Sequence, residues 1–311
     1  MGRPPKILIA GELNVDLILQ NYSQFPVPGL EVVVEDAVLT MGSASALCAA
    51  GLARLGNKVT FAGKVGTDSW GELCIRSLRD LGVETSLVIS DAAVKTGITV
   101  SLSSPADRAM VTYLGSIAEF SADDLPETAL EGFDHLHTSS FFLQRRLRPG
   151  VRGLLAAAHR HGLTTSLDPG CDPDGAWGPD LLEVLSEVDV FLPNEVELSG
   201  VSGCPDPEQA LRKLANGRTL TVAKLGSQGC AALDDGRFVA LPAFSVKPID
   251  TTGAGDSFNA GFLHAWLRRH SLLRAMRFGA ACGALSTLAS GGTAGQATEA
   301  EAERLIAGGV A

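Results

Sequence analysis

Short apolar runs alternate with helical patterns along most of this chain. An apolar run of about four to eight residues between turn residues indicates a buried strand, whereas apolar positions three and four apart indicate an amphipathic helix. We expect strands at 7–11, 59–63, 135–139, 164–168, 190–193 and 220–225, and helices at 44–55, 70–81, 151–161, 181–188 and 207–215. This alternation predicts an α/β fold with a mostly parallel central sheet flanked by helices. Asp168, Asn194 and Lys224 lie at the carboxyl ends of predicted strands, where such sheets bind their ligands.

Two segments depart from this alternation. Residues 32–39 alternate apolar and acidic side chains, and residues 96–113 do so less regularly. A period of two predicts antiparallel strands with one covered face. We therefore expect a single domain over residues 1–311, with a small β-sheet lid formed by approximately residues 12–40 and 95–115. The pair Asp235-Gly236 predicts a hairpin turn between two further strands.

Composition narrows the class of protein. The chain has 311 residues, of which 45% are hydrophobic, as expected for one large globular domain. Its 25 basic and 35 acidic residues give a net charge of −10, which argues against a nucleic-acid surface because such a surface needs a basic patch. The six cysteines include no C-x-x-C pair, and no apolar run reaches the ~18 residues of a membrane span. We expect a cytoplasmic protein with reduced thiols.

The run 250–262, DTTGAGDSFNAGF, carries the clearest chemistry. Its small residues leave backbone amides uncovered at the start of a helical pattern. The bare first turn of a helix presents free N–H groups and the positive end of the helix dipole to an anion. Asp256 lies inside that turn, and an anion cradle beside a base is what transfer of a phosphoryl group to a hydroxyl requires. The structural alternative is a tight turn in which the aspartate only caps the helix.

The whole run resembles, without a gap, the C-terminal signature D-T-x-G-A-G-D-x-F of the PfkB (ribokinase-like) carbohydrate kinases. The resemblance covers nearly the whole chain and implies a ribokinase-like fold with a β-sheet lid. It implies an ATP-dependent sugar kinase that transfers the γ-phosphate to a sugar hydroxyl. Asp256 would be the general base, and the amides of Gly253, Ala254 and Gly255 would form the anion hole. The chain contains no G-x-x-x-x-G-K-[ST], so it is not a P-loop kinase.

The acceptor side of this resemblance lies near the N-terminus. The segment 11–16, GELNVD, resembles the family's first strand and turn, which implies that Asp16, and more weakly Asn14, bind sugar hydroxyls. Gly42 and Ser43 begin a segment similar to the N-terminal signature Gly-Gly-x-x-x-Asn, whose glycines let the backbone approach the sugar. Ser43 stands in place of the second glycine, and Leu47 in place of the asparagine. These two replacements leave the identity of the sugar open.

The nucleotide side lies in the C-terminal half. Asn194 and Glu197 resemble the family's N-x-x-E motif, which implies magnesium held largely through water near the nucleotide phosphates. A capped helix N-terminus would satisfy the same spacing. Residues 224–229, KLGSQG, resemble the family's nucleotide loop, which implies contacts from Lys224, Gly226, Ser227 and Gly229. For Lys224, an exposed position at the end of a strand is an equal alternative.

Some members of the family bind a monovalent cation such as K⁺ beside the anion cradle, largely through carbonyl oxygens. The resemblance implies this site for Asp250 and Thr252, and more weakly for Ala289 and Gly291. His135 and His137 share one face of a predicted strand and could ligate a metal. Because no acid stands at ligand spacing, ordinary strand histidines are the favoured interpretation.

Two alternatives stay open. A nucleoside kinase of the same superfamily would carry a stacking aromatic residue in the lid, where Tyr113 and Phe120 are the candidates. A sugar-binding regulator with a degenerate site would explain Ser43 and Leu47, but not the intact run 253–256. The resemblance implies ATP, magnesium and a small sugar as partners, and we expect neither nucleic acid nor membrane. Exposed edges of the lid would allow a homodimer.

Overall fold

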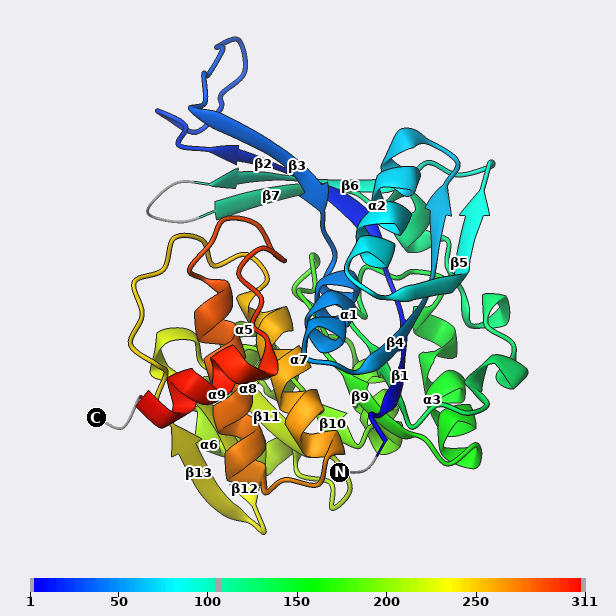
Figure 1. The fold of residues 1–311 in the computed structure, drawn as a ribbon, viewed down its shortest axis with the longest axis vertical. Helices are drawn as coiled ribbons and strands as arrows, with labels where there is room; N and C mark the ends of the chain where they lie inside the picture. The colour runs from blue at the N-terminus through cyan, green and yellow to red at the C-terminus, as the bar shows by residue number, and fades with distance from the viewer. Residues whose placement is uncertain (1–2, 104–107, 309–311) are drawn as a thin grey trace.

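A nine-stranded sheet forms the centre of the computed structural model, which describes residues 3–103 and 108–308. Its strands follow the order β13-β12-β11-β10-β9-β8-β1-β4-β5 (Figure 1). Neighbouring strands from β5 to β11 pair in parallel, and β12 and β13 add antiparallel pairs at one end, so the predicted mostly parallel sheet is confirmed. The strands are β1 (Lys6–Ala10), β4 (Lys58–Gly66), β5 (Glu84–Asp91), β8 (His135–Thr138), β9 (Thr164–Leu167), β10 (Val190–Phe191), β11 (Leu220–Lys224), β12 (Cys230–Asp234) and β13 (Arg237–Leu241).

Side chains along β1 show why both faces of this sheet are covered. Ile7 and Ile9 belong to one hydrophobic cluster, and Leu8 and Ala10 to a second cluster on the opposite face, because successive side chains of a strand point to opposite sides. The first face carries α1 (Ala44–Arg54), α2 (Ser69–Asp80), α7 (Ala254–Leu267), α8 (Leu272–Ser286) and α9 (Glu299–Gly308). The second carries α3 (Val151–Arg160), α4 (Pro179–Val184), α5 (Glu195–Ser202) and α6 (Pro207–Leu214). The helix expected at 181–188 ends at Val184 and continues as a 3₁₀ turn, Leu185–Glu187.

A second, smaller sheet has the order β3-β2-β6-β7 and projects from the main body at the top of Figure 1. It consists of β2 (Asn14–Gln20), β3 (Asp36–Met41), β6 (Gly97–Ser103) and β7 (Arg108–Tyr113). The strand expected at 32–39 therefore begins only at Asp36. Both expected segments form antiparallel pairs, β3 with β2 and β6 with β7, and the two pairs are joined by a parallel pairing of β2 with β6. β1 and β5 are parallel in the main sheet, and β2 and β6, which follow them in the chain, run in the same direction.

The hairpin predicted at Asp235-Gly236 joins β12 to β13 at the edge of the main sheet. Both turn residues have positive φ, 47° and 78°, as a two-residue hairpin turn of this kind needs.

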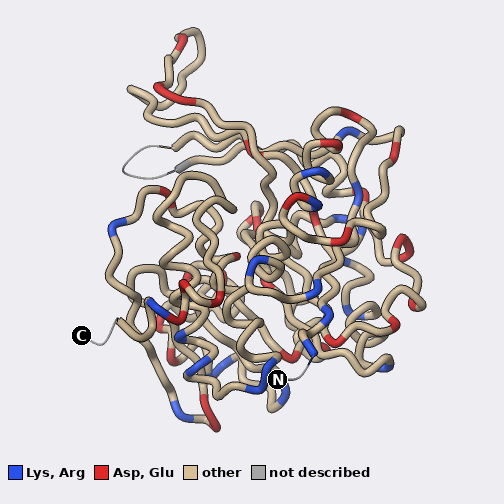
Figure 2. Tube along the Cα trace, in the orientation of Figure 1, with Lys and Arg blue, Asp and Glu red and all other residues tan. Residues whose placement is uncertain are grey.

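Charged residues are interspersed over the main body, whereas β2 and β3 carry acidic residues, Asp16 and Asp36 (Figure 2). All six cysteines are free thiols, as expected from the sequence. No helix in the described part of the chain is long and apolar enough to cross a membrane.

Candidate active site

The N-terminus of α7 is a bare turn. Gly253 precedes it with a φ of 72°, a left-handed conformation that glycine adopts at little cost. The amide of Ala254 donates to the Thr251 carbonyl at 3.2 Å. Within the described residues, the amides of Gly255 and Asp256 meet no backbone acceptor. These amides and the positive end of the helix dipole are therefore available to an anion.

Asp256 lies in this first turn and is partly exposed to solvent. Burial raises the pKa of its carboxyl group to about 8; the charges of Asp168, Glu12 and Glu197 act in the same direction, and Lys224 opposes them. A carboxylate whose pKa lies near neutral pH is a better proton acceptor for a hydroxyl than an ordinary aspartate. The turn therefore combines backbone amides that are available to an anion with a carboxylate that could accept a proton.

The residues predicted to bind the acceptor lie together where the two sheets meet. Asn14 and Asp16 are on β2, and Asn14 Nδ2 donates to Asp16 Oδ1 at 3.1 Å. The amide of Gly42 donates to the Asn14 carbonyl at 2.9 Å, which ties the junction between β3 and α1 to β2. A Cβ atom on Gly42 would collide with the Asp16 carboxylate. The absence of a side chain at position 42 therefore makes room for the Asp16 carboxylate.

Ser43 adopts a backbone conformation that a side chain disfavours. Its φ of 76° and ψ of 132° fall in a region that is essentially restricted to glycine, and such strain costs about 1–3 kcal/mol. Its hydroxyl donates to the Glu12 carbonyl at 2.5 Å and accepts from the Ala46 amide at 3.0 Å, so Ser43 caps α1. The chain keeps this backbone shape where the signature that it resembles has glycine.

Glu12 is a candidate site residue that sequence reasoning missed. Its buried carboxylate accepts hydrogen bonds from the Ser45 amide at 3.1 Å, from Ser45 Oγ at 2.6 Å and from Ser140 Oγ at 2.8 Å. Burial raises its pKa, although these hydrogen bonds act in the opposite direction. Its place just beyond the carboxyl end of β1 was the signal that could have revealed it.

Leu47 connects the N-termini of α1 and α7. A Cβ atom on Gly253 would lie 3.2 Å from Leu47 Cδ1, and one on Gly292 would lie 2.7 Å from both Cδ atoms. The same atom on Gly253 would lie 2.9 Å from the Gly292 carbonyl oxygen. An apolar side chain therefore packs against the anion-binding turn at the position where the signature has asparagine.

Asn194 and Glu197 form the capping box of α5, which was the structural alternative. The side-chain and backbone N–H groups of Asn194 donate to Glu197 Oε1 and Oε2, both at 2.7 Å, and the Glu197 amide donates to Asn194 Oδ1 at 2.9 Å. Burial, followed by the charge of Asp168, raises the pKa of Glu197 to about 7. A divalent cation would stabilise the charged form of this carboxylate, and the second lone pair of each oxygen suits a magnesium ion that keeps several waters. The pair therefore also fits the predicted metal.

Lys224 is not an exposed lysine at the end of a strand. Its side chain is 11% exposed, and its Nζ lies 2.6 Å from Asp168 Oδ2 and 3.2 Å from Asn259 Oδ1. A Cβ atom on Gly255 would lie 3.6 Å from the same Nζ, so the ammonium group is directly behind the anion-binding turn. Asn259 was missed from the sequence, although an amide three residues after Asp256 in an apolar helix was a signal for it.

The predicted nucleotide loop is an exposed turn after β11. Gly226–Gln228 form one 3₁₀ turn, and the amide of Leu225 donates to the Gly229 carbonyl at 2.8 Å. Gly226 and Gly229 have φ of 55° and 98°, and Gly226 and Ser227 are exposed. The backbone of this turn is therefore accessible to a ligand next to Lys224.

Three of the four residues predicted for the monovalent cation are in contact. Asp250 Oδ1 accepts from the Thr252 amide at 2.8 Å, and Asp250 Oδ2 accepts from the Gly291 amide at 2.9 Å. Ala289 lies two residues before Gly291 in the loop after α8. These contacts hold that loop beside the start of α7, and the cation itself stays a prediction.

His135 and His137 act as structural residues of β8. Hydrogen bonds of 2.7–2.9 Å link their rings to Thr164, Ser166 and Ser139. Burial lowers the pKa of His137 to about 4 and lowers that of His135 as well, so both rings are neutral near pH 7. The geometry agrees with ordinary strand histidines.

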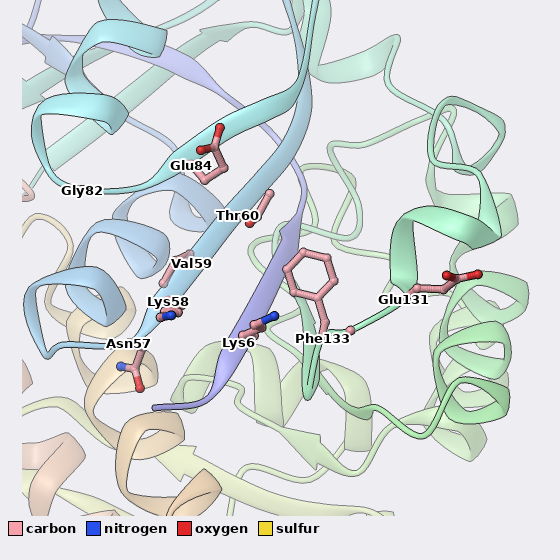
Figure 3. A pocket seen from close by; sticks show the side chains of 10 residues that line it. Lys6, Asn57, Lys58, Val59, Thr60, Gly82, Glu84, Glu131 and Phe133 are labelled. Carbon is pink, nitrogen blue, oxygen red and sulfur yellow. The ribbon is translucent and has the colours of Figure 1, made fainter. Parts of the chain in front are cut away.

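A hollow at the amino ends of the main-sheet strands is separate from this site, which lies at their carboxyl ends. It is lined by residues that include Lys6, Lys58, Glu84 and Phe133 (Figure 3). Lys6 and Lys58 begin β1 and β4, whereas Lys224 ends β11. Because open α/β sheets bind ligands beyond the carboxyl ends of their strands, the hollow is not part of the catalytic arrangement.

Known proteins share this sequence and this fold. The sequence matches the family described as pfkB family carbohydrate kinase over residues 4–299. A fructokinase from Klebsiella pneumoniae is 33% identical over 269 residues, which are 80% of this chain and 86% of that protein. The structure of Arabidopsis thaliana ribokinase complexed with ribose and ATP has a TM-score of 0.83 and 24% identity, and covers 97% of this chain and 99% of that one. A protein assigned as ribokinase II from Escherichia coli, in complex with ATP and Mg²⁺, has a TM-score of 0.85, 23% identity and the same coverage.

The fold is therefore ribokinase-like, with a large mostly parallel sheet and a separate smaller sheet. The family match and the fructokinase relative assign the chain to the class of carbohydrate kinases. The chain belongs to the pfkB family of carbohydrate kinases.

Proposed function

We propose that this protein transfers the γ-phosphate of ATP to a hydroxyl group of a sugar. The observation that carries the proposal is the first turn of α7, where amides without a backbone acceptor lie beside a carboxylate with a pKa of about 8. The fructokinase relative and the ribokinase neighbour with ribose and ATP support the same reaction.

Asp256 accepts the proton of the acceptor hydroxyl while its oxygen attacks the γ-phosphorus. A bond forms between that oxygen and phosphorus, the bond from phosphorus to the bridging oxygen breaks, and ADP leaves. The amides of Gly253, Ala254 and Gly255 stabilise the charge on the phosphoryl oxygens. To do so, the Ala254 amide gives up its hydrogen bond to the Thr251 carbonyl and donates to a phosphoryl oxygen instead. A base in such a position typically contributes ~10²–10⁴-fold to the rate.

The nucleotide phosphates lie between α7 and the turn after β11. Lys224, Gly226, Ser227 and Gly229 contact them in this proposal, and Asn194 and Glu197 would hold magnesium through water. When bound, the metal ion neutralises charge on the phosphates. Asp250, Thr252, Ala289 and Gly291 would hold the monovalent cation.

The acceptor lies between Asn14, Asp16 and Gly42 on one side and Asp256 on the other. The small sheet acts as a lid that excludes water, so that ATP is not hydrolysed before the sugar is in place. Of the two aromatic residues considered for a nucleoside acceptor, Phe120 is 1% exposed and cannot stack on a base, whereas Tyr113 is 52% exposed. Tyr113 is therefore the one of these two residues that can stack on the base of a nucleoside acceptor.

Consumption of ATP across a panel of sugars and nucleosides tests the proposal. With the acceptor that this panel identifies, Asp256→Asn is expected to lower turnover by ~10²–10⁴-fold and to keep nucleotide binding. Asp235→Asn is the matched control, because it removes the same charge in a hairpin turn where Asn-Gly is favoured. Near wild-type turnover of Asp256→Asn refutes the assignment of the base, and absence of turnover with every acceptor favours a regulator.

A further inference from the structure

Asp168, Lys224 and Asn259 form a closed polar cluster underneath the anion-binding turn. Asp168 follows β9, Lys224 ends β11 and Asn259 lies on α7. Asp168 Oδ2 accepts from Lys224 Nζ at 2.6 Å and from Asn259 Nδ2 at 2.5 Å, and Lys224 Nζ also donates to Asn259 Oδ1 at 3.2 Å. Three elements of the fold therefore fix one ammonium group.

The cluster is buried, which makes its charges interdependent. Asp168 is 4% exposed and Asn259 0% exposed. A buried charge is tolerated when it is paired and hydrogen-bonded, and removing one partner leaves the other uncompensated. Asp168 Oδ1 also accepts from the Gly170 amide at 3.1 Å, so both of its oxygens are engaged. Asp168 is thus held in place independently of Lys224.

The ammonium group lies beside the first turn of α7. A Cβ atom on Gly255 would lie 3.6 Å from Lys224 Nζ and 3.9 Å from its Cδ and Cε. The backbone of Lys224 is anchored as well, because its amide donates to the Pro193 carbonyl at 2.9 Å. Positive charge on a fixed side chain therefore adds to the helix dipole where a phosphoryl group would lie.

We propose that Asp168 is a positioning residue of the kinase: together with Asn259 it holds the ammonium group of Lys224 against the Gly253–Gly255 turn, where it stabilises the charge of the transferring phosphoryl group. Asp168 touches neither substrate and acts through Lys224. The inference rests on the proposed phosphoryl transfer and adds to it the groups that orient its cation.

The electrostatics of Asp256 supply a signature of this arrangement. The charged groups that act on Asp256 are Glu12 after β1, Asp168 after β9, Glu197 on α5 and Lys224 on β11, and the thiol of Cys48 on α1 also faces it. Burial raises the pKa of Asp256 to about 8, Asp168 raises it further, and Lys224 lowers it. Loss of Asp168 and loss of Lys224 therefore shift the titration of Asp256 in opposite directions.

The first measurement uses the ligand-free protein. The carboxyl ¹³C resonance of Asp256, assigned by its absence in Asp256→Asn, is followed against pH. Its midpoint is expected to fall by about one pH unit in Asp168→Asn and to rise by a similar amount in Lys224→Met. Asp124→Asn is the control, because it breaks another largely buried lysine pair, Lys64–Asp124 at 3.0 Å, and is expected to leave the midpoint unchanged. Equal midpoints in all variants overturn the proposal.

The second measurement is a double-mutant cycle on kcat with ATP and the identified acceptor. Lys224→Met is expected to lower kcat by ~10²-fold. With kcat taken at the pH plateau where Asp256 is ionised in every variant, the double variant Asp168→Asn/Lys224→Met is expected to have the kcat of Lys224→Met alone, because Asp168 then acts on turnover only through Lys224. Additive losses show that Asp168 has a separate role and overturn the proposal.

Two further outcomes are covered by these variants. If the uncompensated Lys224 prevents Asp168→Asn from folding, the double variant, which lacks both charges, is used for the titration. Its midpoint is expected below that of the wild type, because Asp168 acts on Asp256 more strongly than Lys224 does. If the wild-type protein phosphorylates no acceptor, the proposed function fails, whereas the titration still shows whether Asp168 and Lys224 control Asp256.

Discussion

Replacing Asp256 by Asn is expected to stabilise this protein above neutral pH, although the same change removes its proposed base. The native structure holds the carboxyl group where its charged form is disfavoured, since burial and three neighbouring carboxylates oppose ionisation. Asn has the shape of the protonated side chain without the ability to ionise. Replacing a functional residue whose native environment is unfavourable commonly raises the stability of the protein while it lowers the activity.

The size of this effect follows from two pKa values. An unfolded aspartate has a pKa of about 3.9, and that of Asp256 in the native state is about 8. Between these values the native state keeps a proton that the unfolded chain has released, so the free energy of unfolding falls as the pH rises. A difference of about 4 units corresponds to ~5.5 kcal/mol. Because the side chain is partly exposed and solvent screens its interactions, we expect about 2 kcal/mol.

Calorimetric Tm values of both proteins, measured at one scan rate, test this reasoning. At about pH 5 only about a quarter of this difference has developed, because the unfolded aspartate has been ionised over only about one pH unit, so Asp256→Asn is expected to melt about 1 °C higher. At about pH 8.5 the variant is expected to melt about 4 °C higher, at ~2 °C per kcal/mol for a chain of this size. Asp235→Asn, in the exposed hairpin turn, is expected to show no such pH dependence. A Tm difference that does not change with pH, or a lower Tm of Asp256→Asn at the higher pH, refutes the reasoning.

Two further predictions concern the two substrate sides. Gly42→Ala places a methyl group against the Asp16 carboxylate and is expected to lower kcat/KM for the acceptor by about 10²-fold while the KM for ATP stays unchanged. Gly153→Ala, in an open position on α3, is its control, and equal effects of the two changes would contradict the role of Gly42. Glu197→Gln is expected to raise the Mg²⁺ concentration for half-maximal turnover by ~10-fold, as loss of an outer metal contact does. An unchanged magnesium requirement would remove Glu197 from the metal site.

Features that depend on neighbours in the chain could be predicted from the sequence. The bare turn at 253–256 is visible because small residues leave the amides uncovered immediately before an apolar helical pattern. The relation of Asn194 to Glu197 follows from helical spacing, and the structure contains it as a capping box. The hairpin at Asp235-Gly236 follows from residues that tolerate positive φ. Each of these arises within a few residues of backbone.

Features that depend on distant partners could not be predicted in this way. Lys224 contacts Asp168, 56 residues away in the sequence, and Asn259, 35 residues away. The sequence alone therefore could not decide whether the Lys224 side chain is exposed or buried. The parallel pairing of β2 with β6 depends on the direction in which two separate parts of the main sheet continue. Alternation of apolar and polar residues is the same in a parallel and an antiparallel strand, so the pattern carried no information about it.

The sequence by itself determined the α/β fold, the family and the bare turn at the start of α7, because these are recorded in local periodicity and in one uninterrupted motif. The tertiary structure alone decided the charges around that turn. It desolvated Asp256 and placed Asp168, Glu12 and Glu197 near it, which together raise its pKa to about 8. It also paired the one opposing cation among these groups, Lys224, with Asp168. Electrostatic interactions act through space rather than along the chain, so the properties of the base are set only when β1, β9, β11, α5 and α7 are brought together.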